Sequence, residues 1–224
     1  MEQTPAHEHH NPELLQAIPT TARRLIEIGC SAGALAREFK KVAPHSDYLG
    51  VEVDAGYAKL AERYCDRSVV LDIERADEAF WADNADRDCW IFGDTLEHLV
   101  DPWAVLTRIR ARIPAAGCVV ACIPNAQHWS VQARLSIGDF RYAQEGLLDK
   151  THLRWFTRQT ILELFDQTGF LVANAVARIS ENEPHRDRVL PVIEQMARQL
   201  EVDPQVAVSD ALPLQYVVRA VPKP

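Results

Sequence analysis

The chain has 224 residues, of which 47% are hydrophobic and 25% are charged. This composition predicts a globular protein, and the apolar runs are too short to cross a bilayer. Acidic residues outnumber basic ones and give a net charge of −8, which argues against nucleic acid as a partner because phosphate backbones are anionic.

The beginning of the chain differs in pattern from the rest. The stretch HEHHNP lies beside Pro5 and Pro12, which favours a flexible N-terminal tail over residues 1–20, followed by a single domain over residues 21–224. No charged and apolar leader opens the chain, and its five cysteines form no CxxC pair. Both observations favour a location in the reducing cytoplasm.

Short strand-like runs alternate with helical stripes along the chain. Leu35, Phe39 and Val42, for example, repeat at helical spacing between two such runs. This alternation predicts an α/β fold with a Rossmann-like seven-stranded sheet, mostly parallel with an antiparallel last strand, and helices on both faces. The expected strands are 25–29, 48–53, 68–71, 89–93, 117–123, 170–178 and 214–221.

The regular alternation stops between Asn125 and Phe156. A stretch of this length is too long for an ordinary connection, so we expect an inserted lid at about residues 125–156. Regularity returns at Thr157, which can cap a helix that ends at Gly169.

The stretch LIEIGCSAG combines the first expected strand with a turn. Glu27 lies inside the strand, and Gly29 and Gly33 flank the turn that contains Cys30. In a doubly wound sheet this first turn is where the backbone comes closest to a ligand. The GxGxxG pattern that cradles a diphosphate is absent, whereas a carboxylate attracts a positively charged ligand.

The E-x-G-x-x-x-G pattern resembles motif I of the class I S-adenosylmethionine-dependent methyltransferases, and the resemblance runs from about residue 22 to 170. It implies that S-adenosylmethionine is the cofactor, and that Glu27, Gly29, Cys30 and Gly33 lie around its methionine portion. In the family, carboxylates after the second and third strands bind the ribose and the adenine. The implied further cofactor contacts are Glu52, Val53, Asp72, Ile73 and Asp94.

The stretch CWIFGDTLEHLVDPW resembles the branch that includes the O-methyltransferases of ubiquinone biosynthesis. Methylation of an alcohol or phenol requires removal of a proton, and His98 is our first candidate for the base. The alternative is a histidine that only bonds a neighbouring carboxylate. Asp94, Glu97 and His98 also resemble the divalent metal site of that branch, but Mg²⁺ prefers oxygen ligands and a metal is not favoured.

The stretch GDFRYAQEGLLDKTHLRWFT resembles a block in methyltransferases of polysaccharide and sugar-modifying pathways. The resemblance implies a small polar or glycosyl acceptor, with His152 as a second catalytic candidate. In the alternative interpretation, His152 satisfies a buried backbone group and Asp149 and Arg154 form a surface ion pair. The candidate substrate contacts are Asn125, Trp129, Tyr142, Asp149 and Arg154.

Two other functions stay open on the sequence alone. One is a non-catalytic S-adenosylmethionine-binding or assembly protein. The other is an NAD-dependent oxidoreductase, which the G-x-x-x-G spacing and the missing Tyr-x-x-x-Lys disfavour. The [DN]-P-P-[YFW] tetrapeptide of amide and nucleobase methyltransferases is absent, so the expected partner is a small molecule. A homodimer is left open.

Overall fold

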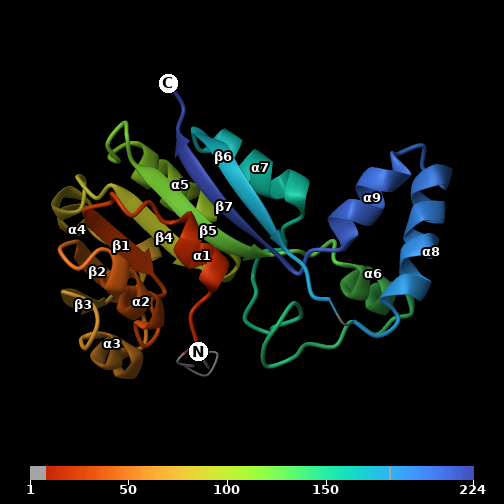
Figure 1. Ribbon diagram of the computed structural model, residues 1–224, viewed down its shortest axis with the longest axis horizontal. Helices are drawn as coiled ribbons and strands as arrows, with labels where there is room; N and C mark the ends of the chain where they lie inside the picture. Colours follow the sequence, from red (N-terminus) through yellow and green to blue (C-terminus); the bar gives the residue numbers. More distant parts are fainter. Residues whose placement is uncertain (1–8, 182) are drawn as a thin grey trace.

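The computed structural model describes residues 9–181 and 183–224 and contains a seven-stranded sheet. The strand order is β3-β2-β1-β4-β5-β7-β6. The strands are β1 (Arg24–Ile28), β2 (Asp47–Glu52), β3 (Arg67–Val70), β4 (Cys89–Gly93), β5 (Cys118–Pro124), β6 (Phe170–Arg178) and β7 (Gln215–Pro222). Strands β1 to β5 pair in parallel, whereas β7 runs antiparallel to both of its neighbours. The predicted sheet is therefore confirmed (Figure 1).

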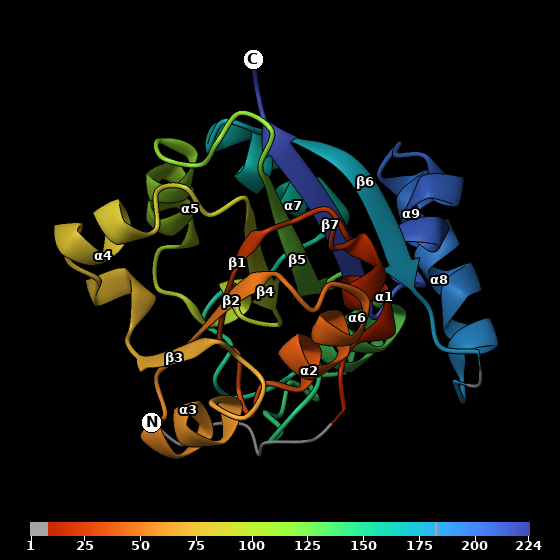
Figure 2. The same cartoon turned by 60° about the vertical axis from the view of Figure 1, so that its left-hand side comes forward.

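Helices cover both faces of this sheet (Figure 2). The helices are α1 (Pro12–Ala17), α2 (Ala34–Val42), α3 (Ala55–Ala61), α4 (Glu78–Asp83), α5 (Pro102–Arg110), α6 (Trp129–Ser136), α7 (Arg158–Gln167), α8 (Arg186–Gln199) and α9 (Pro204–Ala211), with short 3-10 turns η1 (Ile73–Arg75) and η2 (Leu96–His98). Helices α1 and α2 pack on one face, and α4, α5 and α7 pack on the other. Alternate residues of the buried strands fill the two cores, as the period of two requires.

The segment expected to be a flexible tail includes helix α1. Asn11 caps this helix by accepting a hydrogen bond from the Leu14 amide at 3.0 Å, and Leu14 and Ile18 are buried against the sheet. The expectation of flexibility is therefore wrong for residues 12–17, because a short helix gains enough apolar contact to stay packed. Residues 1–8 of the expected tail lie outside the described residues.

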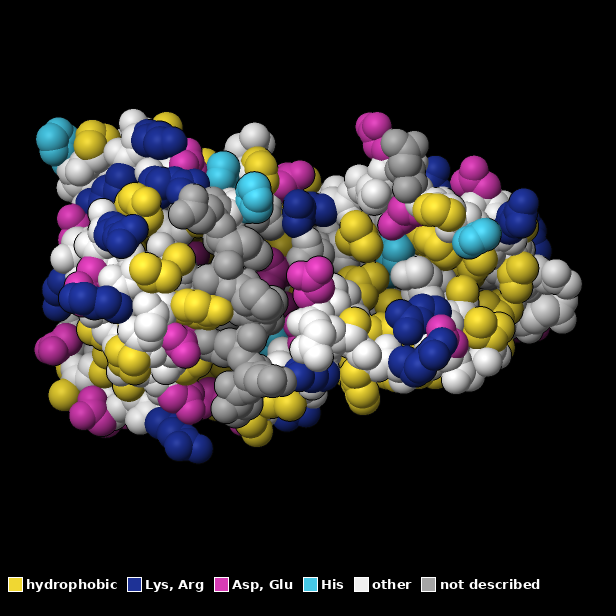
Figure 3. Space-filling model, turned by 90° about the horizontal axis from the view of Figure 1, so that it is seen from below, with side chains coloured by type: hydrophobic (Ala, Val, Ile, Leu, Met, Phe, Trp, Pro, Cys, Tyr) yellow, Lys and Arg dark blue, Asp and Glu magenta, His cyan; other side chains and the backbone are white. Residues whose placement is uncertain are grey.

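Helix α6, at the start of the expected lid, packs with α8 and α9 beside the sheet (Figure 1). Trp129, Ile193 and Ala211 form the small core of this helical group. Hydrophobic side chains gather on its surface (Figure 3), and Ile137 and Leu200 are 78% and 74% exposed. The remainder of the expected lid is an irregular segment held to β5 by a bridge between Asn125 and Phe156.

Within the described ranges, none of the helices has both the length and the apolar character that crossing a bilayer demands.

Candidate active site

The first turn of the sheet has the conformation that its glycines permit. Gly29 and Gly33 have φ values of +74° and +79°, in the left-handed region that favours glycine. A Cβ atom on Gly29 would lie 2.7 Å from Oγ1 of Thr95, so the turn passes close to the segment after β4. The Cys30 side chain is buried near Gly50, which leaves only the Cys30 backbone for a ligand at this turn.

Glu27 is a buried acid beside this turn. Its Oε2 accepts a hydrogen bond from the Tyr48 hydroxyl at 2.9 Å. Burial raises the pKa of Glu27 to about 8, although the Tyr48 hydrogen bond opposes the shift and the nearby Glu52 adds to it. A cation placed beside Glu27 would favour its ionised form.

Glu52 connects the end of β2 to the first turn. Its Oε2 accepts a hydrogen bond from the Ser31 amide at 2.9 Å, and its Oε1 accepts from the amides of Val53 and Asp54 at 2.8 and 3.0 Å. The side chain is buried, whereas Val53 is 55% exposed. These three bonds fix the carboxylate group of Glu52 at the edge of the first turn.

The residues after β3 and β4 differ in how they are placed. Asp72 caps η1 by accepting a hydrogen bond from the Glu74 amide at 3.0 Å. Ile73 is 2% exposed and packs into the core. Its side chain is therefore not open to an adenine ring, and the expectation that it contacts the cofactor is wrong. The turn η1 directs this apolar side chain inward. Asp94 has a φ of +53° and accepts a hydrogen bond from the Gln215 amide side chain.

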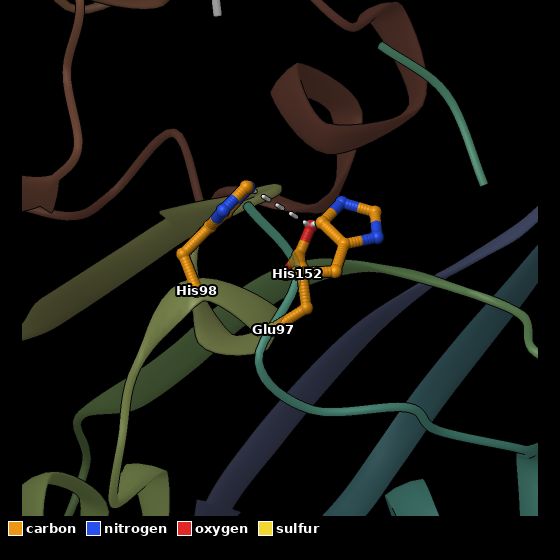
Figure 4. A group of neighbouring side chains, drawn as sticks. All are labelled: Glu97, His98 and His152. Atoms are coloured by element: carbon orange, nitrogen blue, oxygen red, sulfur yellow. Dashed lines mark ion pairs between the residues drawn. The ribbon is translucent and has the colours of Figure 1, made fainter. Parts of the chain in front are cut away.

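The structure brings His98 and His152 together around the buried carboxyl group of Glu97 (Figure 4). The Nε2 atom of each imidazole lies 4.0 Å from Glu97 Oε1, and the ring centroids are 4.8 Å apart. The Glu97 carbonyl accepts hydrogen bonds from the amides of Leu153 and Arg154 at 2.8 and 2.9 Å. These bonds dock the segment that carries His152 onto η2.

The surroundings of this cluster favour neutral side chains. Burial lowers the pKa of His98, and burial together with His98 lowers the pKa of His152 to about 4. Burial raises the pKa of Glu97 well above its usual range, and Asp94 and Asp149 reinforce the shift. Two neutral imidazoles, each able to accept a proton, therefore lie beside a buried acid at pH 7.

The same three side chains form a group that could hold a metal ion. Their ligand atoms all lie within 4.8 Å of one another. The sequence suggested Asp94 as the third member, but the structure places His152 there and Asp94 against Gln215. Two imidazoles and one carboxylate suit a zinc-class transition ion better than Mg²⁺.

Two of the expected substrate contacts are occupied inside the protein. Asn125 is fully buried and donates hydrogen bonds to the carbonyls of Asp210 and Pro213, both at 2.8 Å. Trp129 is 8% exposed, and its Nε1 donates to Glu183 at 2.7 Å. Both residues hold the helical group of α6, α8 and α9 in place, so neither side chain is open to an acceptor.

The other three expected contacts are placed differently from one another. Tyr142 is 64% exposed and stays available to a ligand. Arg154 donates a hydrogen bond to the Val100 carbonyl at 2.9 Å. Asp149 is buried, and its Oδ1 accepts from the Thr151 amide and hydroxyl at 2.8 and 2.6 Å. Asp149 is thus an internal hydrogen-bond acceptor rather than an exposed contact.

Sequence reasoning missed three partners of the site residues: Tyr48, Gln215 and Thr151. Tyr48 and Gln215 lie in strands, where a polar tip has no distinctive pattern. Thr151 directly precedes His152 in the stretch LLDKTHLR, and this neighbourhood was a signal that could have found it.

A strand order with β7 inserted antiparallel, a carboxylate in β1 and a glycine turn after it define a class I S-adenosylmethionine-dependent methyltransferase. The chain matches the family described as a methyltransferase domain over residues 6–175, and it belongs to that family. This confirms the resemblance to the class I S-adenosylmethionine-dependent methyltransferases, the enzyme class and the cofactor inferred from the sequence. The resemblances to the ubiquinone and sugar-modifying branches stay predictions. Membership of this family argues against the NAD-dependent oxidoreductase alternative.

Solved structures show the same fold. The mitomycin 7-O-methyltransferase has a TM-score of 0.60 at 12% identity, over 94% of this chain and 52% of that one. The O-methyltransferase of a Brevibacillus brevis trans-AT PKS multienzyme, in complex with S-adenosyl-L-homocysteine, has a TM-score of 0.61 at 11% identity over 95% and 71%. A putative methyltransferase from Bacillus halodurans has a TM-score of 0.61 at 12% identity over 95% and 98%.

The chain spans about half the length of the first of these structures. None of the curated proteins matches its sequence.

Proposed function

We propose that the protein transfers the methyl group of S-adenosylmethionine to an oxygen atom of a small polar or glycosyl acceptor. The observation that carries this proposal is the pair of neutral imidazoles, His98 and His152, at the buried acid Glu97. An alcohol or phenol must lose its proton as it is methylated, and a neutral imidazole is suited to accept it at pH 7.

The residues of the first turn fit the cofactor. S-adenosylmethionine carries positive charge on its sulfonium and ammonium groups, and Glu27 is a buried acid whose pKa is raised to about 8. The cofactor supplies an electrophilic methyl group when it is bound. Gly29 and Gly33 let the backbone approach it, and Glu52 and Asp72 offer carboxylate oxygens to its ribose and adenine.

His98 is the better placed of the two histidines to act as the base. Its side chain is 29% exposed, whereas that of His152 is 7% exposed. When the site holds the cofactor methyl group and the acceptor oxygen in line, little further entropy is lost in the reaction. This alignment therefore supplies much of the rate enhancement. We assign proton acceptance to His98 and place His152 behind it, in ring contact with it.

A cytoplasmic location is part of this proposal. All five cysteines lie in the described part of the chain, where they are free and buried, as reducing conditions favour.

Mass spectrometry of acceptor panels incubated with the protein and isotopically labelled S-adenosylmethionine tests the proposal. We expect a labelled methyl ether from a phenol, alcohol or sugar. His98→Ala should lower kcat by roughly 10²- to 10⁴-fold while cofactor affinity stays unchanged. His45→Ala is the matched control, because His45 is exposed and distant in sequence from the cluster.

Binding of the cofactor without turnover on any acceptor would favour a non-catalytic binding protein instead. Methylation of nitrogen or carbon in the same assay would overturn the choice of oxygen.

A further inference from the structure

The Nδ1 side of His98 is in contact with one residue of the docked irregular segment. His98 Nδ1 lies 3.2 Å from the Thr151 carbonyl oxygen and 3.1 Å from the Thr151 hydroxyl. The hydroxyl lies 2.6 Å from Asp149 Oδ1, which also accepts a hydrogen bond from the Thr151 amide at 2.8 Å. Asp149 is 3% exposed, so the Asp149 end of this chain of contacts is shielded from water, whereas the His98 side chain is 29% exposed.

The protons of these contacts can be assigned. Asp149 Oδ1 accepts from the Thr151 amide, and the Thr151 hydroxyl has a single proton, which it donates to the same oxygen. Toward His98 the hydroxyl oxygen is then an acceptor, and the Thr151 carbonyl oxygen is an acceptor in any state. Two acceptors facing Nδ1 require the proton to be on Nδ1.

A neutral imidazole with its proton on Nδ1 has its lone pair on Nε2. In this structure Nε2 of His98 is the atom that faces Glu97 Oε1 at 4.0 Å, on the side of His152 (Figure 4). The nitrogen able to accept a proton is therefore the one directed into the cluster.

We propose that Asp149 and Thr151 are positioning residues that fix His98 in the tautomer with its lone pair on Nε2. The inference rests on the proposed function for its catalytic meaning, and it makes the docked segment a condition for a competent base. Asp149 acts through Thr151 and does not contact the acceptor. This assignment replaces the substrate contact that the sequence suggested for Asp149.

The assignment predicts an unusual pair of variants. Asp149→Ala removes the acceptor of the Thr151 hydroxyl proton, which becomes free to point at His98 Nδ1 and to favour the other tautomer. Thr151→Val in the Asp149→Ala background removes that hydroxyl and leaves only the carbonyl facing Nδ1. The second loss should therefore restore the original tautomer, which a purely structural role for these side chains would not do.

The experiment is ¹⁵N NMR of histidine-labelled protein near pH 7, with the His98 signals assigned by their loss in His98→Gln. In the parent protein we expect Nδ1 to be protonated and Nε2 unprotonated. Asp149→Ala should shift this balance toward protonated Nε2, and the double variant should return it. Asp149→Asn and Thr151→Ser keep an acceptor and a hydroxyl, respectively, and should resemble the parent even if the alanine variant folds poorly.

Kinetics give the second readout. Asp149→Ala should lower kcat by up to roughly 10²-fold, the lower bound for a general base, with KM for the cofactor unchanged, and the double variant should recover part of the loss. A parent His98 protonated on Nε2, or an Asp149→Ala spectrum identical to the parent, would overturn the inference. The NMR result does not depend on methyl transfer, so a parent that lacks activity but shows the expected tautomers refutes the proposed function alone.

Discussion

The Tyr48 hydroxyl donates a hydrogen bond to Glu27 at 2.9 Å, and the two residues come from neighbouring parallel strands whose side chains are both buried. This bond satisfies one oxygen of an acid that has been taken out of water. Burial is still the larger effect, and the pKa of Glu27 is raised to about 8. The first turn therefore holds a neutral acid that is ready to ionise when a cation arrives.

Binding of S-adenosylmethionine near pH 7 should release a proton from the protein. Glu27 is mostly protonated in the free protein, and the positive charge of the cofactor favours its ionised form. Calorimetric titration in buffers of different ionisation enthalpy measures the number of protons released. Glu27→Gln should bind the cofactor with no such release, and an equal release from parent and variant would remove Glu27 from this role.

In the cofactor-free protein, Glu27 should make the free energy of unfolding fall as the pH rises. This is the opposite of what an acid does when folding lowers its pKa. The folded state keeps the Glu27 proton up to about pH 8, whereas the unfolded chain loses it near its ordinary pKa of 4.5. Stability from this group is therefore complete below pH 4.5 and is lost as the pH rises toward 8. Urea denaturation at several pH values should show the stability of Glu27→Gln rising relative to that of the parent between pH 4.5 and 8. A stability difference that does not change with pH would contradict the expectation.

Glu52→Ala should weaken cofactor binding by roughly 1.5–3 kcal/mol, or about ten- to 150-fold, the range for hydrogen bonds to a charged group. The structure adds a second reason, because the substitution also frees the Ser31 amide in the first turn. Calorimetry with S-adenosylmethionine and S-adenosylhomocysteine measures the loss. Glu62→Ala, on the exposed surface, is the control, and binding equal to the parent would show that Glu52 is no ribose ligand.

Gly29→Ala should destabilise the protein more than Gly138→Ala. The two glycines have nearly the same φ, +74° and +75°, so alanine suffers the same backbone strain at both. The added Cβ meets Thr95 Oγ1 at 2.7 Å at position 29 and nothing within 4 Å at position 138. Chemical denaturation should give about 1 kcal/mol of loss at Gly138 and a larger loss at Gly29. Equal losses would mean that Thr95 moves aside at no cost.

The pH at which kcat falls to half of its maximum should lie below the usual pKa of a histidine. Burial lowers the pKa of His98, so the base stays neutral as the pH falls through the usual histidine value of about 6.5. Activity should be lost only when the pH falls through the lowered pKa, by about tenfold per unit. Steady-state rates between pH 5 and 8 at saturating cofactor measure this, and half-maximal kcat at pH 6.5 or above would contradict it.

The sheet and its ligand-binding edge were predictable because they follow from short-range patterns. Strand β1 and the turn at Gly29 are contiguous in the sequence, so strand, carboxylate and glycine can be read together. Helix α1 was not predictable in this way, because it is only 6 residues long and depends on the sheet for its burial.

The contacts of the cluster were less accessible to sequence reasoning. His98 and His152 were each candidates, but their common neighbour Glu97 depends on where a long irregular segment docks. Buried hydrogen bonds such as that between Asn125 and Pro213 connect residues far apart in the chain, and no local pattern reports them. The same holds for the proton assignment at Thr151, which requires the directions of three hydrogen bonds at once.

The place of β7 has a consequence for biosynthesis. This strand fills the gap between β5 and β6, and among the strands of residues 9–181 and 183–224 it is the one neighbour of β6 in the sheet. While the ribosome is still making residues 215–222, β5 keeps an unpaired edge and β6 has no strand to pair with. Folding of this half of the sheet is therefore completed only after translation has passed residue 222, when β7 can pair with both neighbours.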